Sequence, residues 1–180
     1  MMIELEVSPG RITWQWAWKM SLIMIVISVA LFATKIDSKS LLNYIVYIPF
    51  VFGLMMAIKQ HKDRDLDGYI TIRRAFTTGF RYASIVSFAM GLFMYVYLKF
   101  INPQVFEQSL VEAENLMLDQ GQAEEQIAMA LDMAKSWGVF MAAVSASIGY
   151  TLLGAFFSLI GALIFKNQKP IYIEVEREEI

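Results

Sequence analysis

Four stretches of the chain are long and apolar enough to cross a lipid bilayer as helices. They cover residues 14–33, 41–58, 76–98 and 137–165, and none contains an aspartate or a glutamate. A helix needs about 20 mostly apolar residues to span the hydrocarbon core, and it satisfies its own backbone hydrogen bonds there. The chain is also 57% hydrophobic, whereas soluble domains are roughly 45–50% apolar. The sequence therefore predicts an all-α, polytopic membrane protein with four transmembrane helices.

The first stretch is predicted to stay in the protein as an anchor. Its apolar run is longer than that of a secretory signal peptide, and Glu4 and Glu6 precede it where a signal peptide carries cations. Aromatic residues crowd its start, as expected at a membrane–water interface: Trp14, Trp16 and Trp18. Three further aromatic residues are expected at the opposite interface: Tyr95, Tyr97 and Trp137.

Lysines and arginines predict which side of the membrane each connection faces. The connection at 59–74 carries five cations, whereas the connection at 99–135 carries two cations and seven acids. Because cytoplasmic connections are enriched in Lys and Arg, we expect 59–74 and both termini in the cytoplasm. Residues 1–13 then form a cytoplasmic N-terminal segment, 14–165 the transmembrane domain, and 166–180 a cytoplasmic tail.

The connection between the third and fourth stretches is predicted to be an extracytoplasmic, amphipathic helical hairpin over residues 102–135. Asn102-Pro103 is typical of a helix start, and Gly121 interrupts the helical pattern. Two apolar stripes follow helical spacing: Phe106, Leu110, Ala113 and Met117, then Ala123, Ile127, Ala130, Leu131 and Ala134. These stripes could pack on each other, lie on the membrane, or hold a protein partner through residues 103–135. The second helix is predicted to run unbroken into the fourth span.

The two ends of the chain share a strand-like pattern. After Pro170, residues 171–176 alternate apolar and polar side chains, and residues 2–7 alternate in the same way. Because a lone strand is marginal, residues 171–176 either pair with the N-terminal segment or stay without regular structure.

The segment DRDLDGYITIRR, residues 63–74, begins like the calcium-binding loop of an EF-hand, with alternate aspartates followed by a glycine. The twelfth position of such a loop supplies a carboxylate to the metal. Here it is Arg74 beside Arg73, and two cations would repel calcium. We therefore interpret the segment as a solvated turn in which Gly68 permits the reversal and Thr71 caps the third helix.

Residues that enzymes commonly use are scarce in this chain. It has no cysteine and one histidine, His61, which stands alone in a charged connection. A zinc site or a histidine-based triad therefore has almost no donors. The net charge of −2 gives no electrostatic footprint for nucleic acid. We predict no enzyme, no cofactor, no metal site and no nucleic-acid partner.

Six cations near the 59–74 connection have two interpretations. They either contact anionic lipid headgroups, at a gain of ~1 kcal/mol each, or they only fix the orientation of the chain. They are Lys59, Lys62, Arg64, Arg73, Arg74 and Arg81.

A row of small residues marks one face of the fourth stretch. Gly154, Ser158 and Ala162 recur every four residues, and such residues let helix backbones approach closely in lipid. This face is predicted to pack against another helix, either within the chain or in a homo-oligomer.

Three segments carry a resemblance to a known family. They are GLMMAIKQHKDRDLDGYITIRRAFTTGF at 53–80, INPQVFEQ at 101–108 and GAFFSLIGALIFKN at 154–167. Together they resemble an uncharacterised family of bacterial membrane proteins, domain of unknown function 4199. The resemblance implies a small multi-pass protein of the bacterial cytoplasmic (inner) membrane. It brings no activity, cofactor or catalytic residue.

The function we expect is that of a non-catalytic accessory or scaffold component of the cell envelope, acting through protein contacts. The alternative is a small oligomeric transporter or channel. Pro49 and Gly53 stand mid-span in the second stretch, where proline is expected to kink the helix, and discontinuous helices mark transporter sites. However, the spans hold no acidic residue that could relay ions.

Overall fold

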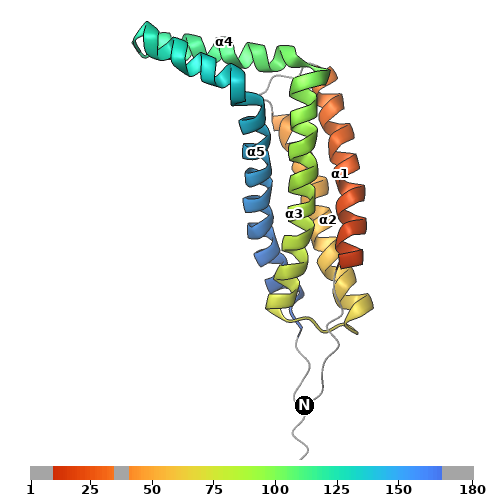
Figure 1. Cartoon of the computed structure of the whole chain (residues 1–180). Helices are drawn as coiled ribbons and strands as arrows, with labels where there is room; N and C mark the ends of the chain where they lie inside the picture. The colour runs from red at the N-terminus through yellow and green to blue at the C-terminus, as the bar shows by residue number, and fades with distance from the viewer. Residues whose placement is uncertain (1–9, 35–40, 168–180) are drawn as a thin grey trace, which may run out of the picture.

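The computed structural model describes residues 10–34 and 41–167, and almost all of them are helical (Figure 1). Both segments with strand-like alternation, 2–7 and 171–176, lie outside the described residues. The long helices are α1 (Gly10–Ala33), α2 (Tyr47–Gln60), α3 (Ile72–Val96), α4 (Pro103–Asp119) and α5 (Glu124–Phe165). Three short helical segments join them: η1 (Leu41–Val46), η2 (His61–Asp65) and η3 (Tyr97–Ile101).

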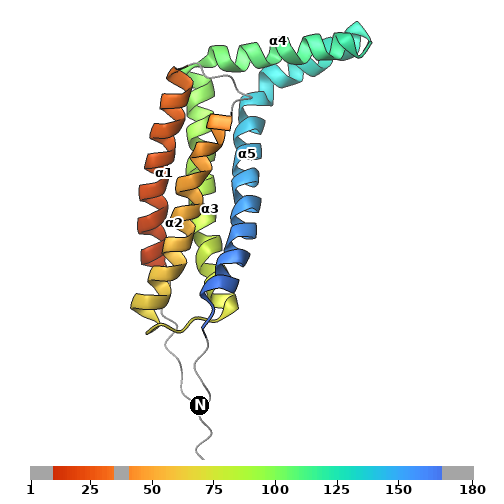
Figure 2. The same ribbon diagram turned by 180° about the vertical axis from the view of Figure 1, so that it is seen from behind.

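Helices α1, α2, α3 and the C-terminal part of α5 run alternately up and down as a four-helix bundle (Figures 1 and 2). In both views α2 and α3 lie between α1 and α5, and each of them contacts both outer helices. Four helical segments are long and apolar enough to cross a membrane: Gly10–Ala33, Tyr44–Asp65, Ile72–Ile101 and Glu124–Phe165. The predicted all-α, polytopic membrane fold is therefore confirmed.

The bundle is apolar on its outside as well as in its core. Large side chains are fully buried between the helices, among them Phe50, Leu54 and Tyr82. On the outer faces, Phe88 is 74% exposed and Leu152 is 66% exposed. A soluble protein rarely exposes contiguous apolar surface of this kind, whereas lipid solvates it, so the outer faces of the spans are suited to the bilayer interior.

The second span differs from the kinked helix that the sequence predicts. A 3₁₀ segment, η1, precedes α2, so Pro49 lies in the first turn of the α-helix rather than in its middle. The first turn tolerates proline because its N–H groups have no intrahelical partner in any case. Gly53 is buried, and a Cβ atom there would collide with the side chains of Met20 and Tyr82. The glycine therefore serves close packing among α1, α2 and α3.

The connection between α2 and α3 is a tight turn fastened to the end of α5. Gly68 has a φ of 83°, as its predicted role in the reversal requires. Ile70 N–H donates to Asn167 O at 2.8 Å, Asn167 N–H donates to Ile70 O at 3.0 Å, and Asn167 Nδ2 donates to Gly68 O at 3.0 Å. The predicted cap is confirmed, because Arg74 N–H donates to Thr71 Oγ1 at 3.3 Å.

Candidate functional site

Helix α4 and the first part of α5 form a hairpin that projects sideways from the end of the bundle opposite the α2–α3 turn (Figures 1 and 2). A Schellman turn closes α4: Gly121, with φ 71°, donates from its N–H to Leu118 O at 2.9 Å, and Gln122 N–H donates to Met117 O at 3.1 Å. Helix α5 then continues unbroken through the bend into the bundle, as predicted. The helical hairpin between the third and fourth spans is thus present in the structure.

Helix α4 starts at the predicted position, but without a cap from the side chain that precedes it. Pro103 is the first residue of α4, as expected, but the side chain of Asn102 does not cap the helix. Instead, Asn102 Nδ2 donates to the hydroxyl of Tyr97 at 3.2 Å. This bond ties the base of the hairpin to the end of the third span.

The hairpin is a thin layer of two helices. Helix α4 packs against α5, yet no residue of α4 is fully buried. Ile127 of α5 is 4% exposed, and the ring of Phe106 lies against Gly138, where a Cβ atom would come within 2.6 Å of Phe106 Cζ. Phe106 of the first predicted stripe therefore contacts α5, and Ile127 of the second stripe is buried, while most of the hairpin surface stays uncovered.

One side of the hairpin carries a groove of about 520 Å³ with an acidic lining. Glu114 of α4 and Glu124, Asp132 and Lys135 of α5 line it, beside apolar residues such as Leu118. Three carboxylates against one ammonium give the groove a negative potential. Among the described residues, no three acidic or histidine side chains are grouped closely enough to hold a metal ion. The lining of the groove is therefore complementary in charge to cationic groups.

The six cations named above do not all gather in one place. Lys59 lies in the last turn of α2, Lys62 and Arg64 belong to η2, and Arg73 and Arg74 lie in the first turn of α3. Arg81 lies nine residues beyond the start of α3, about 13 Å along the helix axis. Five cations thus surround the α2–α3 turn, while Arg81 stands on the side of the bundle, where a long side chain can reach toward an interface.

The small-residue row of α5 packs inside the chain. Gly154, Ser158 and Ala162 are all buried. A Cβ atom at Gly154 would collide with Ala83 Cβ of α3, and a Cβ atom at Gly79 would come within 2.6 Å of Ser158 Oγ. The same two helices meet again where Gly91 contacts the Ser147 side chain. The row therefore sets the close approach of α5 to α3.

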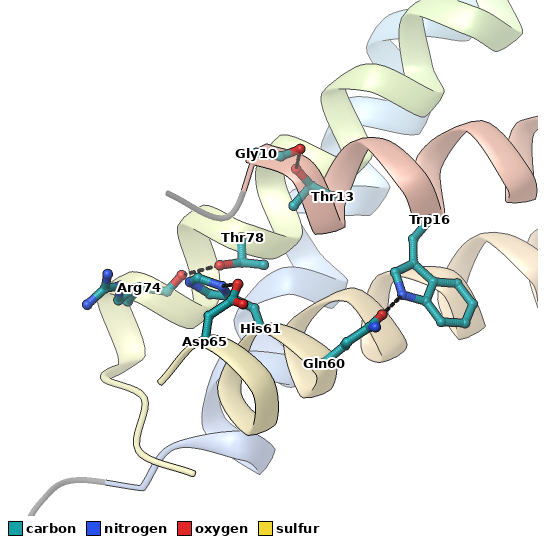
Figure 3. A network of polar contacts seen from close by, with 8 residues as sticks. All are labelled: Gly10, Thr13, Trp16, Gln60, His61, Asp65, Arg74 and Thr78. Atoms are coloured by element: carbon teal, nitrogen blue, oxygen red, sulfur yellow. Dashed lines mark hydrogen bonds and ion pairs between the residues drawn. The ribbon is translucent and has the colours of Figure 1, made fainter. Parts of the chain in front are cut away.

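His61 is not alone in a charged connection, contrary to the sequence-based expectation. It is fully buried, and its Nδ1 lies 2.8 Å from Asp65 Oδ2. Figure 3 shows this pair at the end of α2, beside Arg74 and Thr78 of α3, while the indole N–H of Trp16 donates to Gln60 Oε1 nearby. The Trp16–Gln60 bond joins α1 to the end of α2, and the His61–Asp65 pair holds η2 together beside it.

The aspartates of the EF-hand-like segment have separate roles in this turn. Asp63 is exposed, and Asp65 holds His61. Both belong to the π-helical turn η2, so they do not alternate along an extended metal-binding loop. The resemblance to a calcium loop is therefore confined to the order of the residues.

Asp65→Ala is expected to lower the free energy of unfolding by about 1–3 kcal/mol, because it leaves a buried histidine nitrogen without its partner. Asp63→Ala is the matched control in the same helical turn and should change stability little, since Asp63 is exposed. Thermal unfolding in detergent compares the two variants. Calorimetric titration with calcium should show no binding to either variant or to the unchanged protein. Equal stability of the two variants, or calcium binding abolished by Asp63→Ala, would contradict this assignment.

Two features of the site escaped the sequence-based predictions. The spacing of His61 and Asp65, four residues apart, was a usable signal, but it has meaning only if α2 continues past Gln60 as a helix. The residues of α3 that receive α5 form a four-residue row of small side chains, Gly79, Ala83, Ser87 and Gly91, and this spacing was a second usable signal. Their role requires knowledge of the helix that lies opposite.

Comparisons with known proteins give one family and no closer relative. No curated protein and no solved structure matches the chain. The model of one family, described as a protein of unknown function, DUF4199, matches residues 15–167. This range covers all but the first five residues of α1, together with the rest of the bundle, the α2–α3 turn and the hairpin, so the chain, a multi-pass helical membrane protein, belongs to the family DUF4199.

Proposed function

We propose that this protein is a non-catalytic accessory or scaffold component of the cell envelope that holds a partner protein through the α4–α5 hairpin. The supporting observation is the projection of the hairpin beyond the bundle, with an acidic groove between its helices. The hairpin contributes little to the core of the bundle, so contacts with another protein better explain why the chain has it. The charge of the groove favours a partner with a basic surface.

The polar groups of the bundle core favour this role over transport. The buried polar side chains among the described residues are serines, threonines and His61. Several of them bond to their own helices: Thr78 Oγ1 donates to Arg74 O at 2.8 Å, and Ser87 Oγ donates to Ala83 O at 2.7 Å. Ser147 Oγ donates across to Ser87 O at 3.2 Å and joins α5 to α3. The bonds within a helix satisfy the buried hydroxyls, and the bond from Ser147 is of the kind that joins helices in a membrane.

We also propose that the protein lies in a bacterial cytoplasmic membrane with its termini and the α2–α3 turn in the cytoplasm. The cations that surround this turn and the acids of the hairpin lie at opposite ends of the bundle. Positive residues are retained on the cytoplasmic side, so the hairpin would face outward. On this proposal the cations set orientation, and any headgroup contact is secondary.

Charge reversal on the hairpin tests the scaffold role. The variant Glu114→Lys/Glu124→Lys/Asp132→Lys changes the groove, and Glu107→Lys/Glu112→Lys/Glu125→Lys makes the same charge change outside it. In-cell cross-linking from Leu118 is expected to recover one stoichiometric protein with the unchanged chain and the control. The yield of this cross-linked product should fall at least about tenfold in the groove variant, because its lysines would repel a basic partner surface.

Two results would contradict the proposed scaffold role. If both variants keep the same cross-linked partner, the groove does not hold it. If no partner is recovered and the purified protein moves solute across vesicle membranes, the protein is a transporter or channel instead.

A further inference from the structure

Helix α5 carries an uncovered row of large apolar side chains on its hairpin part. Met129 is 71% exposed, Met133 67%, Trp137 63% and Met141 57%. They follow one another every four residues, so they share one slowly turning face of the helix. These residues lie outside the core contacts that hold the hairpin together.

The row is continuous with the lipid-facing surface of the fourth span. Beyond Met141 the exposed apolar surface of α5 continues through Ile148, at 54% exposed, and Leu152, at 66%. In both views α5 forms the edge of the bundle from which the hairpin projects (Figures 1 and 2). The outer surface of α5 therefore runs without a break into the corner beneath the hairpin.

The acidic groove lies on a different face of α5 from this row of apolar side chains. Ala128 and Asp132 line the groove, and Met129 and Met133 each follow one residue later. One residue corresponds to about 100° around an α-helix. The hairpin part of α5 thus has an apolar face that carries the methionines and an acidic face that borders the groove.

We propose that the hairpin lies on the bilayer, with Met129, Met133 and Trp137 seated in the leaflet nearest to it. Lipid is the partner that we assign to this row, because the row extends the outer surface of α5, which faces lipid in the fourth span. Tryptophan favours the membrane interface, and an amphipathic helix there sinks about 5–10 Å into the headgroup and acyl boundary. Seven acids among residues 99–135 disfavour a seat on anionic headgroups, so the contact is apolar. This inference is independent of any partner in the groove.

Single cysteines can test whether this row of side chains enters the leaflet, because the chain has no cysteine of its own. The full-length protein is placed in zwitterionic phosphatidylcholine vesicles at a high lipid-to-protein ratio. Nitroxide labels are attached to Met129→Cys and Met133→Cys, with Ala128→Cys and Lys135→Cys as controls on the groove side of the same helix. Phe88→Cys, on the exposed face of α3, reports insertion of the bundle.

Labels at 129 and 133 are expected to collide several-fold more with oxygen than with a polar nickel chelate, as at 88, because apolar oxygen concentrates in lipid. Labels at 128 and 135 should show the reverse preference. Because the contact is apolar and the hairpin is acidic, adding anionic lipid should not increase the exposure of the labels at 129 and 133 to oxygen.

Three results would overturn the inference while position 88 still reports insertion. The labels at 129 and 133 could prefer the nickel chelate, as in water. They could be immobile and shielded from both reagents, as in a contact with a second copy or another protein. They could enter lipid only when cationic lipid is present, which would place the acidic face on the membrane.

Discussion

Gly154→Leu is expected to lower the free energy of unfolding by about 3 kcal/mol or to prevent the bundle from assembling. A Cβ atom at this position collides with Ala83 Cβ and comes within 3.3 Å of Phe50 Cζ. Helix α5 cannot move aside easily, because Ser158 and Ser147 hold it close to Gly79 and Gly91 of α3. Thermal unfolding of the purified protein in detergent, followed by circular dichroism, measures the loss.

Gly149→Leu is the matched control on the same helix. No atom lies within 4 Å of a Cβ at Gly149, so leucine fits there without displacement. Leucine is also a better helix former than glycine, by up to about 1 kcal/mol, and this variant should be at least as stable as the unchanged protein. Equal stability of the two variants would contradict the α3–α5 packing. If Gly154→Leu dissociated an oligomer and left the monomer unchanged, the row would serve self-association instead.

The spans and their order could be predicted from the sequence because lipid solvation acts on each helix separately. A run such as residues 76–98 is apolar whatever lies beside it, and α3 covers most of it. The hairpin was predictable for a related reason. Gly121 and Pro103 act on the local backbone, and each fixes a helix end without help from the tertiary fold.

Contacts between helices were harder to predict because they need two partners. The row at Gly154, Ser158 and Ala162 indicates a close approach, and α3 carries a matching row at Gly79, Ala83, Ser87 and Gly91. Neither row by itself shows which helix lies opposite. Similarly, Asp65 in sequence resembles a metal ligand, and only the burial of His61 reveals it as a hydrogen-bond partner. Buried polar pairs depend on the dielectric environment, which a sequence pattern does not specify.

The position of Pro49 shows how a correct local rule can lead to a wrong expectation. Proline does disrupt the middle of a helix, and the apolar run of residues 41–58 predicts that Pro49 stands there. The chain instead begins this span with the 3₁₀ segment η1 and starts α2 at Tyr47. Hydropathy measures the length of a span, whereas the type of helix within it depends on packing.

Labelling of single cysteines from outside the cell is expected to show which end of the bundle faces the cytoplasm. A cysteine at Asp63→Cys in the α2–α3 turn and one at Asp119→Cys at the hairpin tip are treated with a charged maleimide in intact spheroplasts. Both positions are exposed, so access of the reagent is decided by the membrane alone. We expect at least about tenfold more labelling at 119 than at 63, because a charged reagent crosses hydrocarbon poorly.

Opening the spheroplasts should bring both positions to equal labelling, and a cysteine at Phe88, on the lipid-facing surface of α3, should stay weakly labelled throughout. The physical cause is the retention of the five cations around the turn on the cytoplasmic side, while the acidic hairpin carries no such restraint. Strong labelling at 63 and not at 119 in intact spheroplasts would invert the topology and place the acidic groove in the cytoplasm. A partner protein would then have to be sought on that side.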